Sequence, residues 1–174
     1  MWGGLSDRGG LPDRQLSFPA PFGAIIDDRM VNELNAIVEE LGGEASLGRT
    51  LANEADLRSA IREGLPQRVV GSVMDSAGLT LKDLSASLHL SPRSLQRRGR
   101  QGRLARHESD RVYRLARAVA LARHYIGDKD RAARWLKRPN RALGGSTPLE
   151  LLDTEAGART VENVLGRIAY GGVS

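Results

Sequence analysis

The segment GGST, Gly144 to Thr147, holds the residues of this sequence that could most directly do chemistry. Two glycines before a helix N-terminus can present free backbone N–H groups to a phosphate, and the helix dipole adds to the attraction. However, the segment lacks the lysine of the GxxxxGK[ST] phosphate loop. A steric explanation also fits this segment: Pro139 ends one helix, the glycine pair forms a turn, and Pro148 starts the next helix. We therefore expect a turn here, and nucleotide binding is the weaker alternative.

The other candidate catalytic groups do not form a set. His89, His107 and His124 have neither HxxH nor HExxH spacing, which would indicate a metal site. Glu108 and Asp110 lie on different faces of a predicted helix, where acids in the first turn favour the helix dipole. No nucleophile, base and orienting group are spaced to act together. We predict no enzyme activity, no catalytic or metal-binding residue, and no cofactor.

The composition predicts an all-α globular protein. The 174 residues are 40% hydrophobic but only 4% aromatic, and Ala, Leu and Val carry the apolar pattern, which favours packed helices over a sheet. The chain has no cysteine, so a disulfide framework is excluded. It shows neither a secretion signal nor an apolar run of about 20 residues. We therefore expect a cytoplasmic protein with no membrane partner.

The net charge of +5 conceals an asymmetry between the two parts of the chain. Residues 1–60 hold 5 Arg and 10 Asp or Glu, a net charge of −5, whereas residues 61–174 hold 21 Lys or Arg and 11 acids, a net charge of +10. Nearly all of these bases are Arg, whose planar guanidinium suits bidentate contacts with phosphates and carboxylates. The later part is therefore expected to bind an anionic partner.

Helical periodicity, capping residues and breakers predict a series of helices. Residues 1–24 are rich in Gly and Pro without an apolar period, which indicates a flexible arm. Capping boxes are expected at Thr80 with Asp83 and at Thr147 with Glu150, and an aspartate cap at Asp128. Helices are predicted from Asp27 or Asp28 to about Leu41, over 53–63, from Pro66 to before Gly78, over 81–88, from Pro92 to about Gln101, over 108–126, from Asp128 to before Pro139, from Pro148, and over 154–169.

The pair of helices over 81–88 and 92–101 has the spacing of a helix-turn-helix, in which the second helix enters the major groove of DNA. Leu84, Leu88, Leu90 and Leu95 are expected to face inward. No acid interrupts the chain from Ser91 to His107, so the arginines repel one another unless nucleic acid neutralises them. A basic bundle surface that binds an acidic protein is the alternative. The expected DNA-binding residues are Ser91, Arg93, Ser94, Gln96, Arg97, Arg98, Arg100 and Arg103.

Over roughly residues 60–172 the sequence resembles the Xre/MbcA/ParS family of antitoxins. The resemblance lies in GLTLKDLSASLHLSPRSLQRRGRQGRL, SDRVYRLARAVALA and ARWLKRPNRALGGSTPLELLDTEAGARTVENVLGRIAYGG, of which the part from Trp135 to Gly172 is the most specific. It implies a helical bundle with a Xre-like helix-turn-helix domain and a C-terminal helical toxin-binding domain. It also implies a RES-domain toxin that acts on NAD, an NAD pocket that the antitoxin occludes, a homodimer, and repression of the operon through operator DNA.

On this basis we expect a flexible arm over 1–24, an N-terminal helical segment over 25–64, a helix-turn-helix DNA-binding domain over 65–126 and a toxin-binding domain over 127–174. The small residues after Ala169 could enter a cleft of the toxin. Trp135 and Asn140 are further candidates, although Trp135 fits a core position and Asn140 a turn. A stand-alone regulator, whose C-terminal domain dimerises or senses a ligand, is the alternative function. The expected toxin-binding residues are Arg138, Arg141, Arg159, Asn163, Arg167, Tyr170, Gly171, Gly172 and Ser174.

Overall fold

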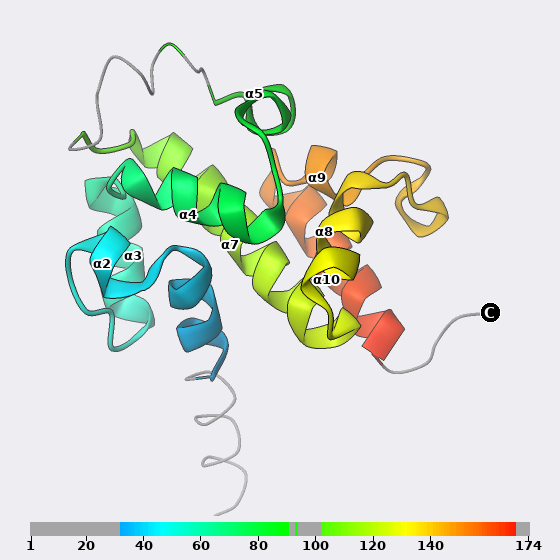
Figure 1. Ribbon diagram of the computed structural model, residues 1–174, viewed down its shortest axis with the longest axis horizontal. Coiled ribbons are helices and arrows are strands. Elements are labelled where there is room, and N and C mark those ends of the chain that lie inside the picture. Colours follow the sequence, from blue (N-terminus) through cyan, green and yellow to red (C-terminus); the bar gives the residue numbers. More distant parts are fainter. Residues whose placement is uncertain (1–31, 91–92, 94–101, 170–174) are drawn as a thin grey trace, which may run out of the picture.

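The computed structural model describes residues 32–90, 93 and 102–169, and the regular elements in these ranges are helices (Figure 1). The all-α prediction is therefore confirmed. Residues 1–24 and most of the helix predicted over 92–101 lie outside the described residues. After helical residues 32–40, the elements are α2 (Gly43–Leu47), α3 (Glu54–Glu63), α4 (Arg68–Ala77), α5 (Leu81–Leu88), α7 (Arg106–Ile126), α8 (Lys129–Lys137), the 3₁₀ turn η1 (Arg141–Leu143), α9 (Pro148–Leu151) and α10 (Glu155–Ala169).

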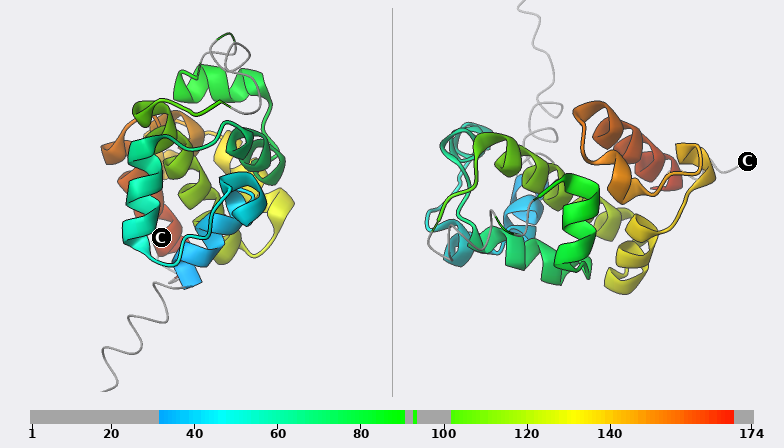
Figure 2. Two further views of the ribbon diagram at one scale, coloured as in Figure 1. Left: turned by 90° about the vertical axis from the view of Figure 1, so that its left-hand side faces the viewer. Right: turned by 90° about the horizontal axis from the view of Figure 1, so that it is seen from above.

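The long helix α7 lies at the centre of the fold. It contacts α3 and α4 as well as α8 and α10, and the views in Figure 2 show helices around it on several sides. Its residues Val112, Leu115 and Val119 are buried, together with a series of alanines that lets neighbouring helices approach closely. Burying one leucine or valine side chain contributes about 1.5–3 kcal/mol, so α7 is a large part of the stabilising core.

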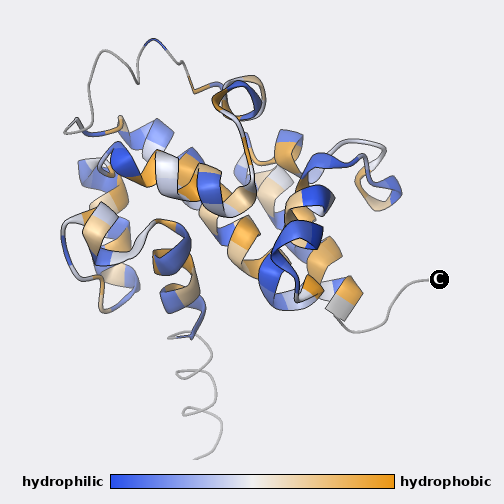
Figure 3. Ribbon diagram, in the orientation of Figure 1, coloured by the Kyte–Doolittle hydropathy of each residue, from blue (hydrophilic) through white to orange (hydrophobic). Residues whose placement is uncertain are grey.

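The buried side chains form one continuous hydrophobic cluster that extends from Leu34 to Leu165. Figure 3 shows that the helices carry both hydrophobic and hydrophilic residues, as amphipathic helices around a shared core do. Within the described part of the chain, this core is continuous across residue 126, the end of the expected DNA-binding domain. The parts on either side of this boundary are packed together by α7.

Several helix ends follow the predicted local signals. The capping boxes of Thr80 with Asp83 and of Thr147 with Glu150 are both present. The carboxylate of Asp128 accepts a 2.7 Å hydrogen bond from the backbone N–H of Arg131 at the start of α8. The last helix begins at Glu155, one residue after the predicted start. These predictions are confirmed because each depends on residues only two or three positions apart.

Two predicted helix starts are wrong, and one short helix was missed. The helix expected at Pro66 begins at Arg68, because residues 65–67 pair with 102–104 in an isolated antiparallel bridge. In this bridge, the N–H of Gln67 donates to the carbonyl of Gly102 and the N–H of Leu104 to that of Leu65, both at 2.8 Å. The short helix α2 was not predicted. Helix α7 begins two residues early, where the Glu108 carboxylate accepts a hydrogen bond from the N–H of Ala105 at 2.7 Å.

Replacing Gly157 with alanine should destabilise the protein by about 1–3 kcal/mol, because the added methyl group would overlap the backbone carbonyl of Leu151 where α9 meets α10. The matched control is Gly166→Ala in the same helix, where a methyl group meets no atom within 4 Å. That change should be neutral or stabilising, since alanine is the better helix former. Urea denaturation measures both, and equal stability of the two variants would contradict this account of the α9–α10 contact.

Candidate functional site

The start of α5 is fixed by hydrogen bonds between Thr80 and Asp83. The Asp83 carboxylate accepts 2.8 Å bonds from the N–H and the hydroxyl of Thr80, and the Thr80 hydroxyl oxygen accepts from the N–H of Asp83 at 3.2 Å. These bonds stabilise the charged form, and the backbone bond from Thr80 is the main reason that the pKa of Asp83 is lowered. Helix α5 is therefore held in a fixed position relative to the chain before it.

The end of α5 is a sharp turn at His89. Among the described residues, His89 is the non-glycine residue with a positive φ, at 51°, which is the left-handed conformation of a helix C-cap. The carbonyl of Leu88 accepts a 3.2 Å bond from Arg111 of α7, and Leu90 beyond the turn is fully buried. The expected inward positions Leu84, Leu88 and Leu90 are confirmed, and Leu95 lies outside the described residues. The turn at His89 therefore ends α5 and places Leu90 in the core.

Two of the eight expected DNA-binding residues can be located. Arg93 is helical and exposed, and Arg103 is half-exposed beside the bridge to Pro66. A guanidinium nitrogen of Arg103 lies 3.6 Å from a carboxylate oxygen of Glu63, to which Arg49 also binds at 3.1 Å. A hydrogen bond from Ser59 lowers the pKa of Glu63, and the two arginines lower it further. The other six candidates, Ser91, Ser94, Gln96, Arg97, Arg98 and Arg100, lie outside the described residues.

The GGST loop does not offer free amides to a phosphate. The N–H groups of Gly144, Gly145 and Ser146 donate to backbone carbonyls of residues 141, 140 and 143, and that of Thr147 donates to the Glu150 carboxylate at 2.9 Å. Both glycines have positive φ, 67° and 88°, which other residues rarely adopt. The steric explanation of this loop is therefore confirmed.

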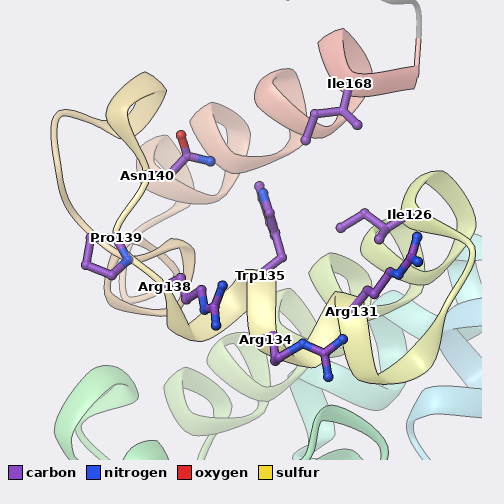
Figure 4. A pocket seen from close by; sticks show the side chains of 8 residues that line it. All are labelled: Ile126, Arg131, Arg134, Trp135, Arg138, Pro139, Asn140 and Ile168. Atoms are coloured by element: carbon purple, nitrogen blue, oxygen red, sulfur yellow. The ribbon is translucent and has the colours of Figure 1, made fainter.

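Beside this loop, an open cleft of about 480 Å³ lies between α8, the end of α7 and the end of α10 (Figure 4). Trp135 projects into it, with Asn140 on one side and the two isoleucines on the other. Trp135 is half-buried and packs against the core, as its spacing predicts, and its contact with a toxin stays a prediction. The lining residues are Ile126, Arg131, Arg134, Trp135, Arg138, Pro139, Asn140 and Ile168.

Of the expected toxin-binding residues, Arg138 lines this cleft. Arg141 is exposed in η1, whereas Arg159, Asn163 and Arg167 are exposed at successive turns of one face of α10. Arg159 pairs with Glu155 at 3.2 Å. The last four candidates, Tyr170, Gly171, Gly172 and Ser174, lie outside the part of the chain that the structure describes.

Sequence reasoning missed four of the eight residues that line the cleft. Asn140 has its expected turn role, since its side chain accepts a 2.9 Å bond from the N–H of Ala142, yet it also lines the cleft. The missed residues are Ile126, Arg131, Arg134 and Ile168. The spacing of Arg131, Arg134, Trp135 and Arg138, one helical face, is a signal that could have found part of this set.

Two arginines of α7 connect the elements that carry the two candidate surfaces. Arg114 is buried and donates to the carbonyls of Leu152 and Asp153 at 3.0 and 2.8 Å, at the end of α9. Arg117 lies 3.1 Å from the carboxylate of Glu162 on α10 and 3.4 Å from that of Glu33. Burial raises the pKa of Glu162, and the nearby Arg117 opposes this shift. Charged groups thus add to the apolar contacts of α7.

No three acidic or histidine side chains in the described part of the chain lie close enough to hold a metal ion. None of the helices there is both long and apolar enough to span a membrane.

The capped helix α5, the left-handed turn at His89 and the exposed Arg93 beyond it indicate a helix-turn-helix protein, here joined to a second helical module with its own cleft. Residues 56–117 match the family described as the antitoxin Xre-like helix-turn-helix domain, and residues 121–171 match the antitoxin Xre/MbcA/ParS C-terminal toxin-binding domain. The chain belongs to the Xre family of antitoxins.

Proteins named "Antitoxin Xre" from three bacteria are similar to this chain over most of its length. The one from Photorhabdus laumondii is 39% identical over 120 residues, which is 68% of this chain and 81% of the relative. That from Yersinia enterocolitica is 32% identical over 138 residues, or 78% and 89% of the two chains. That from Pseudomonas putida is 31% identical over 122 residues, or 70% and 76%.

Replacing Arg114 with methionine should destabilise the protein by about 1–3 kcal/mol, because the carbonyls of Leu152 and Asp153 would lose their buried hydrogen-bond donor. Arg106→Met is the control, since Arg106 is exposed in the first turn of the same helix. Denaturant unfolding followed by circular dichroism measures both variants. A loss for Arg114→Met no larger than that of the control would show that the contact of α7 with α9 does not depend on this side chain.

Proposed function

We propose that this chain is the antitoxin of a type II toxin–antitoxin pair and acts as a cytoplasmic homodimer. Residues 65–126 bind operator DNA and residues 127–174 bind the toxin, while 25–64 complete the helical core and 1–24 form an arm. Membership of the Xre antitoxin family supports this proposal, because the matches cover both a helix-turn-helix and a toxin-binding domain. The rival, a ligand sensor that uses the GGST loop, is disfavoured because the amides of this loop are already bonded.

We also propose that the toxin is a RES-domain protein and that the antitoxin occludes its NAD pocket. This proposal rests on the resemblance to the Xre/MbcA/ParS family. The NAD chemistry would belong to the toxin, so the antitoxin requires neither a cofactor nor a catalytic group. The exposed residues Arg138, Arg141, Arg159, Asn163 and Arg167 are available for this contact, and Tyr170, Gly171, Gly172 and Ser174 follow them in the chain.

The observation that best supports the combination of the two activities is the arrangement of both surfaces along α7. Arg111, near the start of α7, contacts the end of α5, whereas Ile126 at its end lines the cleft. A helix of 21 residues is roughly 30 Å long, which separates the two surfaces by much of that distance. DNA and toxin can therefore be bound at the same time, as repression of the operon by a toxin–antitoxin complex requires.

Arg93→Ala and Arg97→Ala should each weaken binding to the operator by about 1–3 kcal/mol, because each would lose contacts to base edges. Arg103→Ala should mainly reduce the dependence of binding on salt, by a slope of about 1, because a phosphate contact releases a counterion. Arg58→Ala on the exposed face of α3 is the control. Mobility-shift titrations at several salt concentrations measure these effects. Equal losses on operator and random duplexes would remove base readout from the proposal.

Expression of the protein encoded beside this chain should stop growth, and co-expression of this chain should restore it. Removing residues 168–174 should abolish this protection but leave operator binding unchanged, because the small terminal residues would occupy the toxin's pocket while the helix-turn-helix is intact. Growth assays and mobility shifts provide the two measurements. Full protection by the shortened chain would show that these residues do not block the toxin.

A further inference from the structure

We propose that the cleft between α8 and α10 binds an acidic segment of the toxin that carries an apolar side chain next to its carboxylates. This inference rests on the proposed function and deepens it, because it names the surface that holds the toxin and the chemistry that this surface recognises.

The first observation is an accumulation of positive charge that the described structure does not neutralise. Arg131, Arg134 and Arg138 lie along one face of α8, and none of their guanidinium groups forms an ion pair or hydrogen bond with any residue that the structure describes. Asp130 is one helical turn from Arg134 but does not pair with it. Neighbouring like charges at helical spacing repel, so an external acid at this face would relieve a cost that the free protein carries.

Lys137, another cation of α8, shows the contrast. The ammonium group of Lys137 donates a 2.8 Å hydrogen bond to the carbonyl of Gly78, so it attaches α8 to the end of α4. Arg114 and Arg117 of α7 are likewise bound, the first to a backbone carbonyl and the second to a carboxylate. The three cleft arginines are therefore not needed to hold the fold together.

The second observation is the apolar surface beside these charges. Ile168 is the large hydrophobic residue that the described structure leaves exposed, at 36%, and it faces the cleft together with Ile126 and half-buried Trp135 (Figure 4). Tryptophan and arginine are the residues that most often dominate the energy of protein interfaces. A volume of about 480 Å³ is in the range of clefts that bury a compact group. The occupant must therefore supply both carboxylates and an apolar side chain.

A protein segment fits this combination better than nucleic acid does. A DNA backbone offers closely spaced phosphates but no apolar group for Ile126, Trp135 and Ile168. The cleft also lies at the end of α7 away from the contact between Arg111 and α5, beside which the recognition helix is expected. An acidic segment with one apolar side chain satisfies both the charge and the apolar walls, and its charge would also accelerate the encounter.

The test measures the affinity of the full chain for the toxin encoded beside it, using biolayer interferometry. The cleft variant Arg131→Glu with Arg138→Glu should bind on the order of 100-fold more weakly, because two favourable charge pairs become repulsive. The control is Arg58→Glu with Arg62→Glu, which makes the same change of charge on two exposed arginines of α3. Trp135→Ala should also weaken binding, by at least tenfold.

A direct readout does not depend on these variants folding correctly. The chain has two tryptophans, Trp2 and Trp135, so replacing Trp2 with phenylalanine and incorporating 5-fluorotryptophan gives one fluorine resonance in the cleft. This resonance should shift when unlabelled toxin is added and should not shift with operator DNA. Replacing the acidic residues of the toxin segment with arginines should restore binding to the variant with Arg131→Glu and Arg138→Glu.

The outcomes separate this inference from the proposed function. If the toxin binds the wild type and the cleft variant equally, or leaves the fluorine resonance unmoved at saturation, the cleft inference is overturned and the proposed function stands. If the cleft variant loses operator binding while it keeps the toxin, the cleft binds nucleic acid and the inference is again overturned. If even the wild type binds no toxin, the proposed function fails and the cleft inference fails with it.

Discussion

The burial of α7 is the physical constraint on which the rest of the structure depends. Five apolar residues of this helix are within 1% of complete burial, and exposing their side chains to water would be unfavourable: Val112, Leu115, Ala116, Val119 and Ala122. The other helices must therefore cover it, and its alanines allow them to approach closely. Both candidate surfaces are positioned by the same contacts, because α5 is attached near the start of α7 and the cleft lies at its end.

This shared helix explains why one small chain can carry two binding surfaces in fixed relation. The matched family domains lie over 56–117 and 121–171, but α7 continues from the first into the second, and one continuous core extends through both. Arg114 and Arg117 add hydrogen bonds and ion pairs from α7 to α9, α10 and Glu33. A structural change at one surface can therefore reach the other only if a well-packed helix moves. This favours a rigid connection between the two candidate surfaces over a flexible one.

The parts of the candidate site that the sequence predicted are those specified by neighbouring residues. Thr80 with Asp83, the turn after Leu88 and the glycine turn before Thr147 each depend on bonds across a few positions. The helix start at Pro66 was mispredicted because the pairing with Arg103 comes from a distant part of the chain. Trp135 is a second case in which local sequence was not enough. Its spacing suggested a core position, and only the residues that surround it in space reveal that one side faces a cleft.

The helical class, most helix ends, the basic character of the later part and the resemblance to an antitoxin family could all be predicted from the amino-acid sequence, because composition, periodicity and capping act over short stretches of chain. Which side chains meet depends on the packing of whole helices. The cleft exists because Ile126, the arginines of α8 and Ile168, which belong to three helices, converge when α8 and α10 pack against α7. Such convergence depends on the packing angles and contacts of whole helices, and no local pattern encodes these.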